Sequence, residues 1–148
     1  MKIVTHSGNF HTDDIFGVAV LLFVYPNSEV IRTRDEQIIA SADIVIDVGG
    51  VYDSAKLRFD HHQIGGALNR ENTVPYASFG LVWKEYGEKV SGSKEIAEMI
   101  EKDLVLAVDA IDNGISVSVP VFDGVSEYTI GDFFGSFKTN TDTEEQLY

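Results

Sequence analysis

The stretch ADIVIDVGG, residues 42–50, is an apolar run that ends at Asp47 and a Gly-Gly pair. Continuous apolar residues without alternation are typical of a strand that is covered on both faces, as in a parallel sheet. The two glycines mark the turn that ends the strand. We therefore predict a buried parallel strand here, with Asp47 at its carboxyl end.

The segments around this strand alternate between strand and helix patterns. Three further strands are predicted, in KIVTH (2–6), SEVIRTR (28–34) and LRF (57–59). Helices are predicted from Thr12 or Asp13 to the residues before Pro26, in DEQIIAS (35–41), and over 74–87 and 93–114. This order predicts an α/β fold, with a parallel, Rossmann-like sheet flanked by helices, in a single domain over residues 1–148.

The composition limits the class of protein. The chain has no cysteine, which excludes disulfides and thiolate metal sites and is typical of a reducing, cytoplasmic setting. The longest apolar run, IFGVAVLLFVY (15–25), is too short to span a bilayer, so we expect no membrane contact. The net charge of −13 opposes simple electrostatic capture of nucleic acid. It indicates either a solvated acidic face or carboxylates gathered around divalent cations.

Imidazoles and carboxylates follow three of the predicted strands. His6 ends the first strand, Asp47 ends the strand of 42–50, and Asp60, His61 and His62 follow the last one. The carboxyl ends of parallel strands meet at one edge of a sheet, where ligands bind in open α/β folds. These side chains are therefore predicted to form one site.

All four histidines lie in two short segments, HSGNFHTDD (6–14) and DHH (60–62), each beside aspartates. Histidines that only fill hydrogen-bonding roles would not be expected to gather in this way, so we favour metal ligands. A ligand set of imidazole nitrogens and carboxylate oxygens, without thiolates, suits Mn²⁺ best, and Mg²⁺, Co²⁺, Fe²⁺ or Zn²⁺ are alternatives. The candidates exceed the needs of one cation. We predict two, about 3.5–4 Å apart, with Asp47 as the shared carboxylate.

The segment AVDAIDNG (107–114) offers two more aspartates, three residues apart on one face of a predicted helix. An ordinary helix end with an Asn-Gly stop is the alternative interpretation. Asp109, however, lies in an apolar run near the helix C-terminus, where a carboxylate is unfavourable unless a cation is near. We prefer Asp109 to Asp112 as a metal ligand and leave the choice between them open.

Six motifs, taken together, resemble a known family. In chain order they are THSGNFHTDD, IRTRD, ADIVIDVGGVYD, RFDHHQ, PYASFGLVWKEYG and AVDAIDNG, which cover most of residues 3–114. They are similar to UPF0160, the melanocyte-proliferating-gene-one family of metal-dependent hydrolases, within the DHH phosphoesterase superfamily. The resemblance implies the amino-terminal domain of a DHH-type phosphoesterase. The carboxyl-terminal domain that usually closes over the substrate is expected to be absent.

The resemblance also implies roles for individual residues. One cation would be bound by His6, His11 and Asp47, and the other by Asp13, Asp47, His61 and Asp109. His62 would face the substrate phosphate, and Asp60 would orient His61, since metal-bound histidines usually have such a partner. Arg58 and Arg70 would hold phosphate oxygens, although for each the commoner role is that of an exposed arginine.

Three functions follow as hypotheses. The first, implied by the resemblance, is a metal-dependent 3′–5′ exonuclease that acts on RNA or short oligonucleotides. The second is a phosphohydrolase of small molecules such as pyrophosphate or nucleotides. The third is a non-catalytic metal-binding or interaction module. The expected partner is a phosphodiester or phosphate-ester substrate, and the sequence leaves open whether the chain forms a homo-oligomer.

Overall fold

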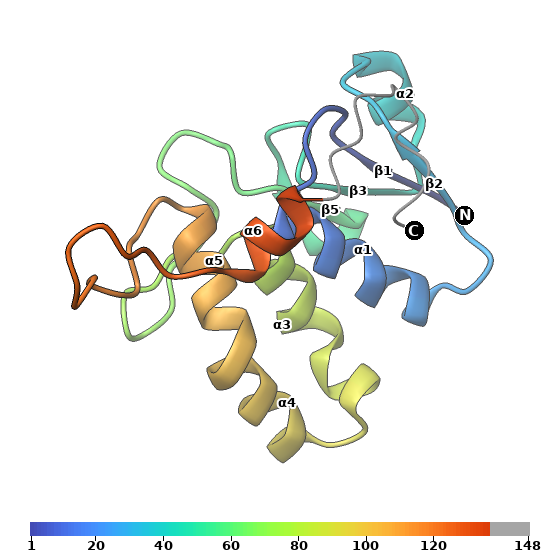
Figure 1. The fold of residues 1–148 in the computed structure, drawn as a ribbon. Coiled ribbons are helices and arrows are strands. Elements are labelled where there is room, and N and C mark those ends of the chain that lie inside the picture. The colour runs from blue at the N-terminus through green and yellow to red at the C-terminus, as the bar shows by residue number, and fades with distance from the viewer. Residues whose placement is uncertain (137–148) are drawn as a thin grey trace.

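The computed structural model describes residues 1–136, so residues 137–148 of the predicted domain lie outside the described part (Figure 1). Five strands form one sheet in the order β2-β1-β3-β5-β4. Their bounds are β1 (Lys2–Thr5), β2 (Glu29–Arg32), β3 (Ile44–Ile46), β4 (Tyr52–Asp53) and β5 (Arg58–Phe59). All neighbouring pairs are parallel except β4–β5, which is antiparallel. The predicted α/β fold with a parallel sheet is confirmed, and the short antiparallel edge strand is an addition.

Most of the helices occur where the sequence patterns place them, with shifted bounds, but the single helix predicted over 93–114 is divided into three segments. They are α1 (Thr12–Val24), α2 (Glu36–Ser41), α3 (Ser78–Ser91), α4 (Lys94–Ile100), α5 (Leu106–Asp112) and α6 (Ile130–Gly135). A π-helical segment over Glu101–Val105 joins α4 to α5, and a 3₁₀ turn covers Ser54–Lys56. Helix α1 begins at Thr12, one of the two predicted starts, and His11 is its N-cap residue. No helix was predicted for α6.

The sheet carries a large core on one face and a small one on the other. Figure 1 shows α1, α3 and α5 on one side of the sheet and α2 on the opposite side. Ile3, Ile44, Ile46 and Phe59 face the large core, where they pack with residues of α1 and α3. Val45 points the other way, toward the α2 side. This alternation along β3 confirms that the strand is buried on both faces.

The last described helix, α6, packs on the outside of α1. Phe134 and Phe16 meet edge to face, with their ring centroids 5.9 Å apart. Thr129 caps α6 by accepting a hydrogen bond from the backbone N–H of Asp132. Within residues 1–136, no helix combines the length and apolar character that a membrane crossing requires.

Helix α1 approaches the sheet most closely at Gly17. A Cβ at this position would lie 2.2 Å from Cδ1 of Ile46, which is fully buried, and 3.5 Å from Cα of Phe79. We expect Gly17→Ala to lower the free energy of unfolding by about 1–3 kcal/mol, because overpacking outweighs the better helix propensity of alanine. Urea titration measures this. Gly135→Ala, where a Cβ would meet no atom of residues 1–136 within 4 Å, is the matched control and should be nearly neutral. Equal stability of the two variants would contradict the packing argument.

Candidate metal centre

The turns after β1 and β3 bring His6 and Asp47 together at the carboxyl edge of the sheet. Asp47 directly follows β3 with φ +55°, a left-handed conformation that aspartate tolerates better than most residues. Its backbone N–H donates to the carbonyl of Phe59, 3.1 Å away, so the turn stays paired to β5. The side chain lies with its Oδ2 3.2 Å from Nε2 of His6. Both residues are almost completely buried.

His61 approaches Asp47 from the other side. Its Nε2 is 3.5 Å from Oδ1 of Asp47 and 3.1 Å from Oδ2 of Asp112. Asp47 therefore lies between two imidazoles, each facing a different carboxylate oxygen. This is the arrangement expected of a shared carboxylate, and the bridging role stays a prediction.

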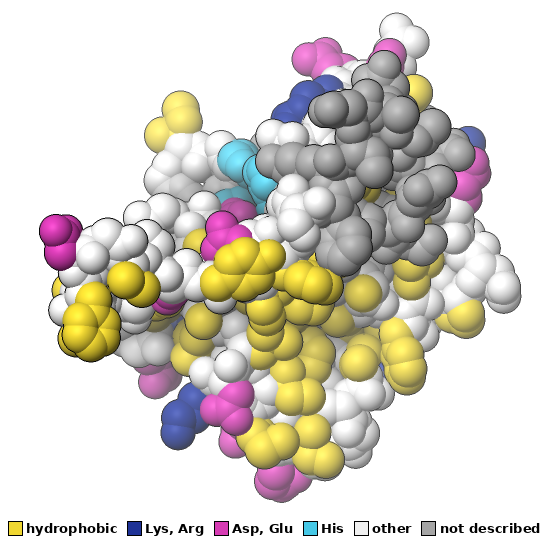
Figure 2. All heavy atoms as spheres, in the orientation of Figure 1, with side chains coloured by type: hydrophobic (Ala, Val, Ile, Leu, Met, Phe, Trp, Pro, Cys, Tyr) yellow, Lys and Arg dark blue, Asp and Glu magenta, His cyan; other side chains and the backbone are white. Residues whose placement is uncertain are grey.

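Three groups of side chains have ligand atoms within 4.8 Å of one another, and each has the composition of a cation site. The groups are His6, His11 and Asp47; Asp13, His61 and Asp112; and Asp47, His61 and His62. The first is the set predicted for one cation. In the second, Asp112 takes the place that we had assigned to Asp109. Figure 2 shows histidine side chains reaching the surface beside acidic ones.

Three buried polar atoms in this cluster make no hydrogen bond within the described residues. They are Nε2 of His6, Oδ2 of Asp47 and Nε2 of His61. The atoms lie near one another, but they are not aligned for hydrogen bonds. A buried polar atom without a partner is costly, and cations bound at the groups above would satisfy these atoms. The donor set therefore fits divalent cations.

The carboxylates and imidazoles of the cluster shift one another's pKa values strongly. Burial and the nearby carboxylates of Asp47, Asp112 and Asp109 raise the pKa of Asp13 well above its ordinary value. Burial opposes ionisation of Asp47, but its contacts with His6 and His61 hold the pKa of that carboxyl well below its ordinary value. Burial lowers the pKa of His61, but Asp112 and Asp47 outweigh this and raise it to about 11. Without cations, protons have to neutralise this cluster.

The N-terminus of α3 holds two of the carboxylates in place. The backbone N–H groups of Ser78 and Phe79 donate to Asp13, at 3.1 and 2.7 Å. The hydroxyl of Ser78 donates to Oδ1 of Asp47 at 3.2 Å. Asp13 thus supplies the cap that Ala77, the N-cap residue, lacks, and it lies at the positive end of the helix dipole. Ser78 is not among the predicted site residues, because a serine within a predicted helix carries no signal of this contact.

Asp14 is a buried carboxylate that is also not among the predicted site residues. Its Oδ2 is 3.3 Å from Nε2 of His6 and 3.3 Å from a guanidinium nitrogen of Arg32. Burial raises the pKa of Asp14 to about 6, although His6 and Arg32 act in the opposite direction. Arg32 also donates to the carbonyls of Gly8 and Asn9. Asp14 and Arg32 therefore hold the loop between β1 and α1 next to His6.

The DHH motif is organised around its aspartate. Asp60 accepts hydrogen bonds from the backbone N–H groups of Gly50 and His62, and its Oδ1 lies 2.7 Å from Nδ1 of His62. It joins the turn after β3 to the turn after β5. The predicted partner of Asp60 was His61, but the structure pairs it with His62. The His61 side chain is buried, whereas that of His62 is 59% exposed.

Asp109 belongs to a different network. Its Oδ2 lies 2.7 Å from the Arg70 guanidinium, and its Oδ1 accepts a hydrogen bond from the backbone N–H of Gly80 at 3.0 Å. Arg70 also donates to Glu101 and to the carbonyl of Pro75. The contacts therefore do not support our preference for Asp109 as a ligand. Arg70 supplies the positive charge that the buried carboxylate of Asp109 requires. Because its guanidinium is already bound to Asp109, Glu101 and Pro75, Arg70 is not placed to hold a phosphate, as had been predicted.

Arg58 does not reach the cluster either. Its guanidinium donates to the backbone carbonyls of Ala42, Asp43 and Lys56, at 2.8–3.0 Å. Because neighbouring residues of a strand point to opposite faces, Arg58 lies on the α2 side while Phe59 enters the main core. The predicted phosphate contact for Arg58 is replaced by a role in joining β3 to β5.

Comparison with known proteins adds independent information. Residues 2–146 match the sequence profile of a family described as "Uncharacterised protein family (UPF0160)". The human MYG1 exonuclease is 36% identical over a match that covers 78% of this chain and 36% of the relative. A MYG1 protein of Caenorhabditis elegans is 37% identical, with 85% and 42% covered, and one of Dictyostelium discoideum is 34% identical, with 78% and 39% covered. The chain thus spans about two fifths of the length of these relatives. No solved structure matches significantly.

The two neighbouring aspartates of α5 should respond differently to removal. In metal-free buffer, we expect Asp109→Ala to lower the free energy of unfolding by roughly 3 kcal/mol, because it leaves Arg70 buried with only Glu101 as a charged partner. Asp112→Ala, the matched comparison, removes one partner of His61 but leaves Asp47 and Asp13 near that imidazole, so its loss should be smaller, about 1 kcal/mol. Chemical denaturation in the presence of a chelator measures both values. A larger loss for Asp112→Ala would contradict the division of roles.

Proposed function

This chain belongs to the UPF0160 family, and from that membership we propose that it is a divalent-metal-dependent phosphoesterase. In the finer form of the proposal, it hydrolyses RNA or short oligonucleotides from the 3′ end, in keeping with the name exonuclease that its mammalian relatives carry. Mn²⁺ is the preferred cation, because the donor set mixes imidazole nitrogens with carboxylate oxygens.

One observation carries the proposal. Two buried histidines, one after β1 and one after β5, aim unpaired Nε2 atoms at the carboxylate of Asp47 after β3. A structural histidine would be expected to find a hydrogen-bond partner in the interior. Three strand ends that converge with unsatisfied ligand atoms favour a pair of cation sites over a packed core.

The residues divide into two cation sites and an outer group. His6, His11 and Asp47 would hold one cation, and Asp13, His61 and Asp112 the other, with Asp47 next to both. Bound cations would make water a better nucleophile and offset the negative charge of a phosphate ester. In the hydrolysis a water oxygen bonds to phosphorus, the bond to the ester oxygen breaks, and that oxygen takes up a proton.

His62 is the side chain best placed to contact the substrate. Asp60 holds its Nδ1, which orients the ring and leaves Nε2 for a phosphoryl oxygen. The exposure of His62 at the edge of the cluster allows such a contact, whereas His61 is buried against Asp47 and Asp112. The adjacent histidines are therefore assigned different tasks, one as a ligand and one as a contact to the substrate.

Metal binding tests the two-site arrangement. Titration with Mn²⁺ near neutral pH should saturate close to two ions per chain, and Asp47→Ala should bind neither tightly, since it removes the shared carboxylate. Asp123→Ala, which changes an exposed aspartate in the loop before α6, is the charge-matched control and should keep both ions. Calorimetry and metal analysis after gel filtration give the stoichiometry. Unchanged stoichiometry in Asp47→Ala would exclude the bridging role.

The two histidines of the motif provide the kinetic test. Wild-type protein with Mn²⁺ should hydrolyse a short RNA, and chelation should abolish this. His61→Ala should lose one ion. His62→Ala should keep both and hydrolyse more slowly, on the order of 10²–10³-fold for one lost transition-state contact. Exchanged effects would mean that the two roles are reversed. Preference for pyrophosphate over RNA would support the small-molecule hypothesis, and bound Mn²⁺ without any hydrolysis would support a non-catalytic module.

A further inference from the structure

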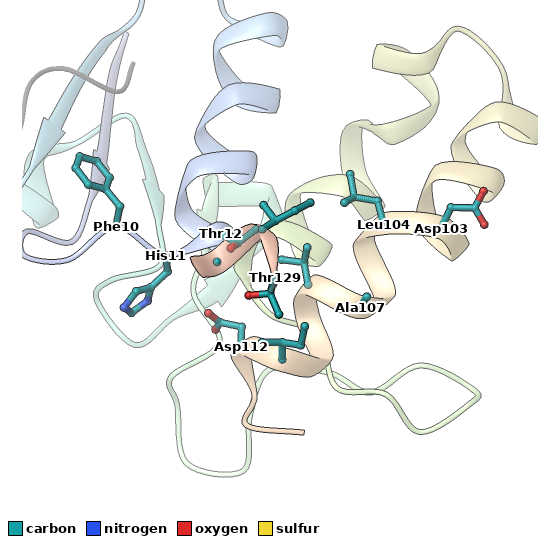
Figure 3. A pocket seen from close by; sticks show the side chains of 12 residues that line it. Phe10, His11, Thr12, Asp103, Leu104, Ala107, Asp112 and Thr129 are labelled. Atoms are coloured by element: carbon teal, nitrogen blue, oxygen red, sulfur yellow. The ribbon is translucent and has the colours of Figure 1, made fainter. Parts of the chain in front are cut away.

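An apolar pocket of about 470 Å³ opens directly beside the metal centre, between α5 and α6. Two of its lining residues, His11 and Asp112, also belong to the candidate cation sites. Figure 3 shows these two side chains toward one side of the pocket and Leu104 and Asp103 toward the other. A ligand held at the cation sites could therefore extend into the pocket without a break.

The walls of the pocket are mostly hydrophobic. Leu104, Ala107, Val108 and Ile111 lie along the π-helical segment and α5, and Ile130 faces them from the start of α6. Figure 2 shows the hydrophobic surface over α5 and α6 next to the acidic and histidine side chains of the cluster. The volume lies within the range of small-molecule sites, which combine apolar walls with a few polar groups.

We propose that this pocket receives the nucleobase of the nucleotide whose phosphate lies at the metal centre. The inference rests on the proposed phosphoesterase function and names its substrate class. It makes the substrate a nucleotide or the end of an oligonucleotide, because mostly apolar walls favour a flat organic ring, and no lysine or arginine is among the described lining residues to bind a second phosphate.

The charges around the pocket point to the same ligand. Asp103, on the side of the pocket away from the cation sites, would repel a further anionic group, so pyrophosphate gains nothing from the pocket. Carboxylates accept hydrogen bonds, which suits the exocyclic amine of adenine, cytosine or guanine. Asp112 follows Asp103 by nine positions along the helical segment, roughly 13 Å by helical rise, which is room for a sugar and a base.

The affinities of three small ligands distinguish the contribution of the base from that of the phosphate. With Mn²⁺ present, adenosine 5′-monophosphate should bind on the order of tenfold more tightly than ribose 5-phosphate, as measured by calorimetry. Ala107→Trp fills the pocket from an exposed helical position and should remove this preference while ribose 5-phosphate still binds. Ile111→Ser makes the wall polar without filling it and should weaken the preference in the same direction.

The control is Ala40→Trp, the same change at an exposed alanine of α2 on the other side of the sheet, which should keep the wild-type preference. Equal affinity for the two phosphates in wild-type protein, or an unchanged preference in both pocket variants, would overturn the inference.

Binding of adenosine, which has no phosphate, tests the pocket independently of the proposed phosphoesterase function. Its contact with Ala107 and Ile111, seen by chemical-shift changes that Ala107→Trp removes, supports the pocket even if no ester is hydrolysed. Lack of Mn²⁺-dependent hydrolysis with this contact intact would count against the phosphoesterase alone.

Discussion

The buried carboxylate of Asp47 between two imidazoles is the interaction on which the site depends. The residue ends β3, takes a left-handed backbone conformation and directs its two oxygens toward His6 and His61. Each of the three residues comes from a different strand end, so the site exists only when β1, β3 and β5 lie side by side in parallel. The strand order of the sheet therefore decides which residues form the site.

A cluster of this kind has to be held together against its own repulsion. Asp13, Asp14, Asp47 and Asp109 are all completely or almost completely buried, and like charges at short range raise one another's pKa. The fold opposes this repulsion with directed donors: the N-terminus of α3 on Asp13, Arg32 on Asp14, and Arg70 with the Gly80 N–H on Asp109. Within the described residues, these contacts still leave Nε2 of His6, Oδ2 of Asp47 and Nε2 of His61 without a hydrogen bond, so these three ligand atoms are held in place but not satisfied.

The position of the site accounts for part of the acidity of the chain. A net charge of −13 would repel a nucleic acid, but several of the carboxylates lie where divalent cations would offset them. The apolar pocket continues from this edge, with walls from α5 and α6, and it adds hydrophobic contact to a surface that offers phosphate few basic groups. A short substrate, bound by its terminal phosphate and base, is compatible with both features.

The sequence by itself determined the order of the main elements, though not β4 or α6, together with the parallel sheet and the gathering of histidines and aspartates at its carboxyl edge. These follow from local patterns, because apolar runs, glycine turns and strand-end residues need no knowledge of distant neighbours. Only the tertiary structure decided which partner each polar residue meets. Asp109 faces Arg70 and Asp112 faces His61, Asp60 holds His62, and Ser78 reaches Asp13 from 65 residues away. Two aspartates on one helix face are equivalent by periodicity, and they differ because one turn of α5 packs against a buried arginine while the next lies at the open edge of the sheet.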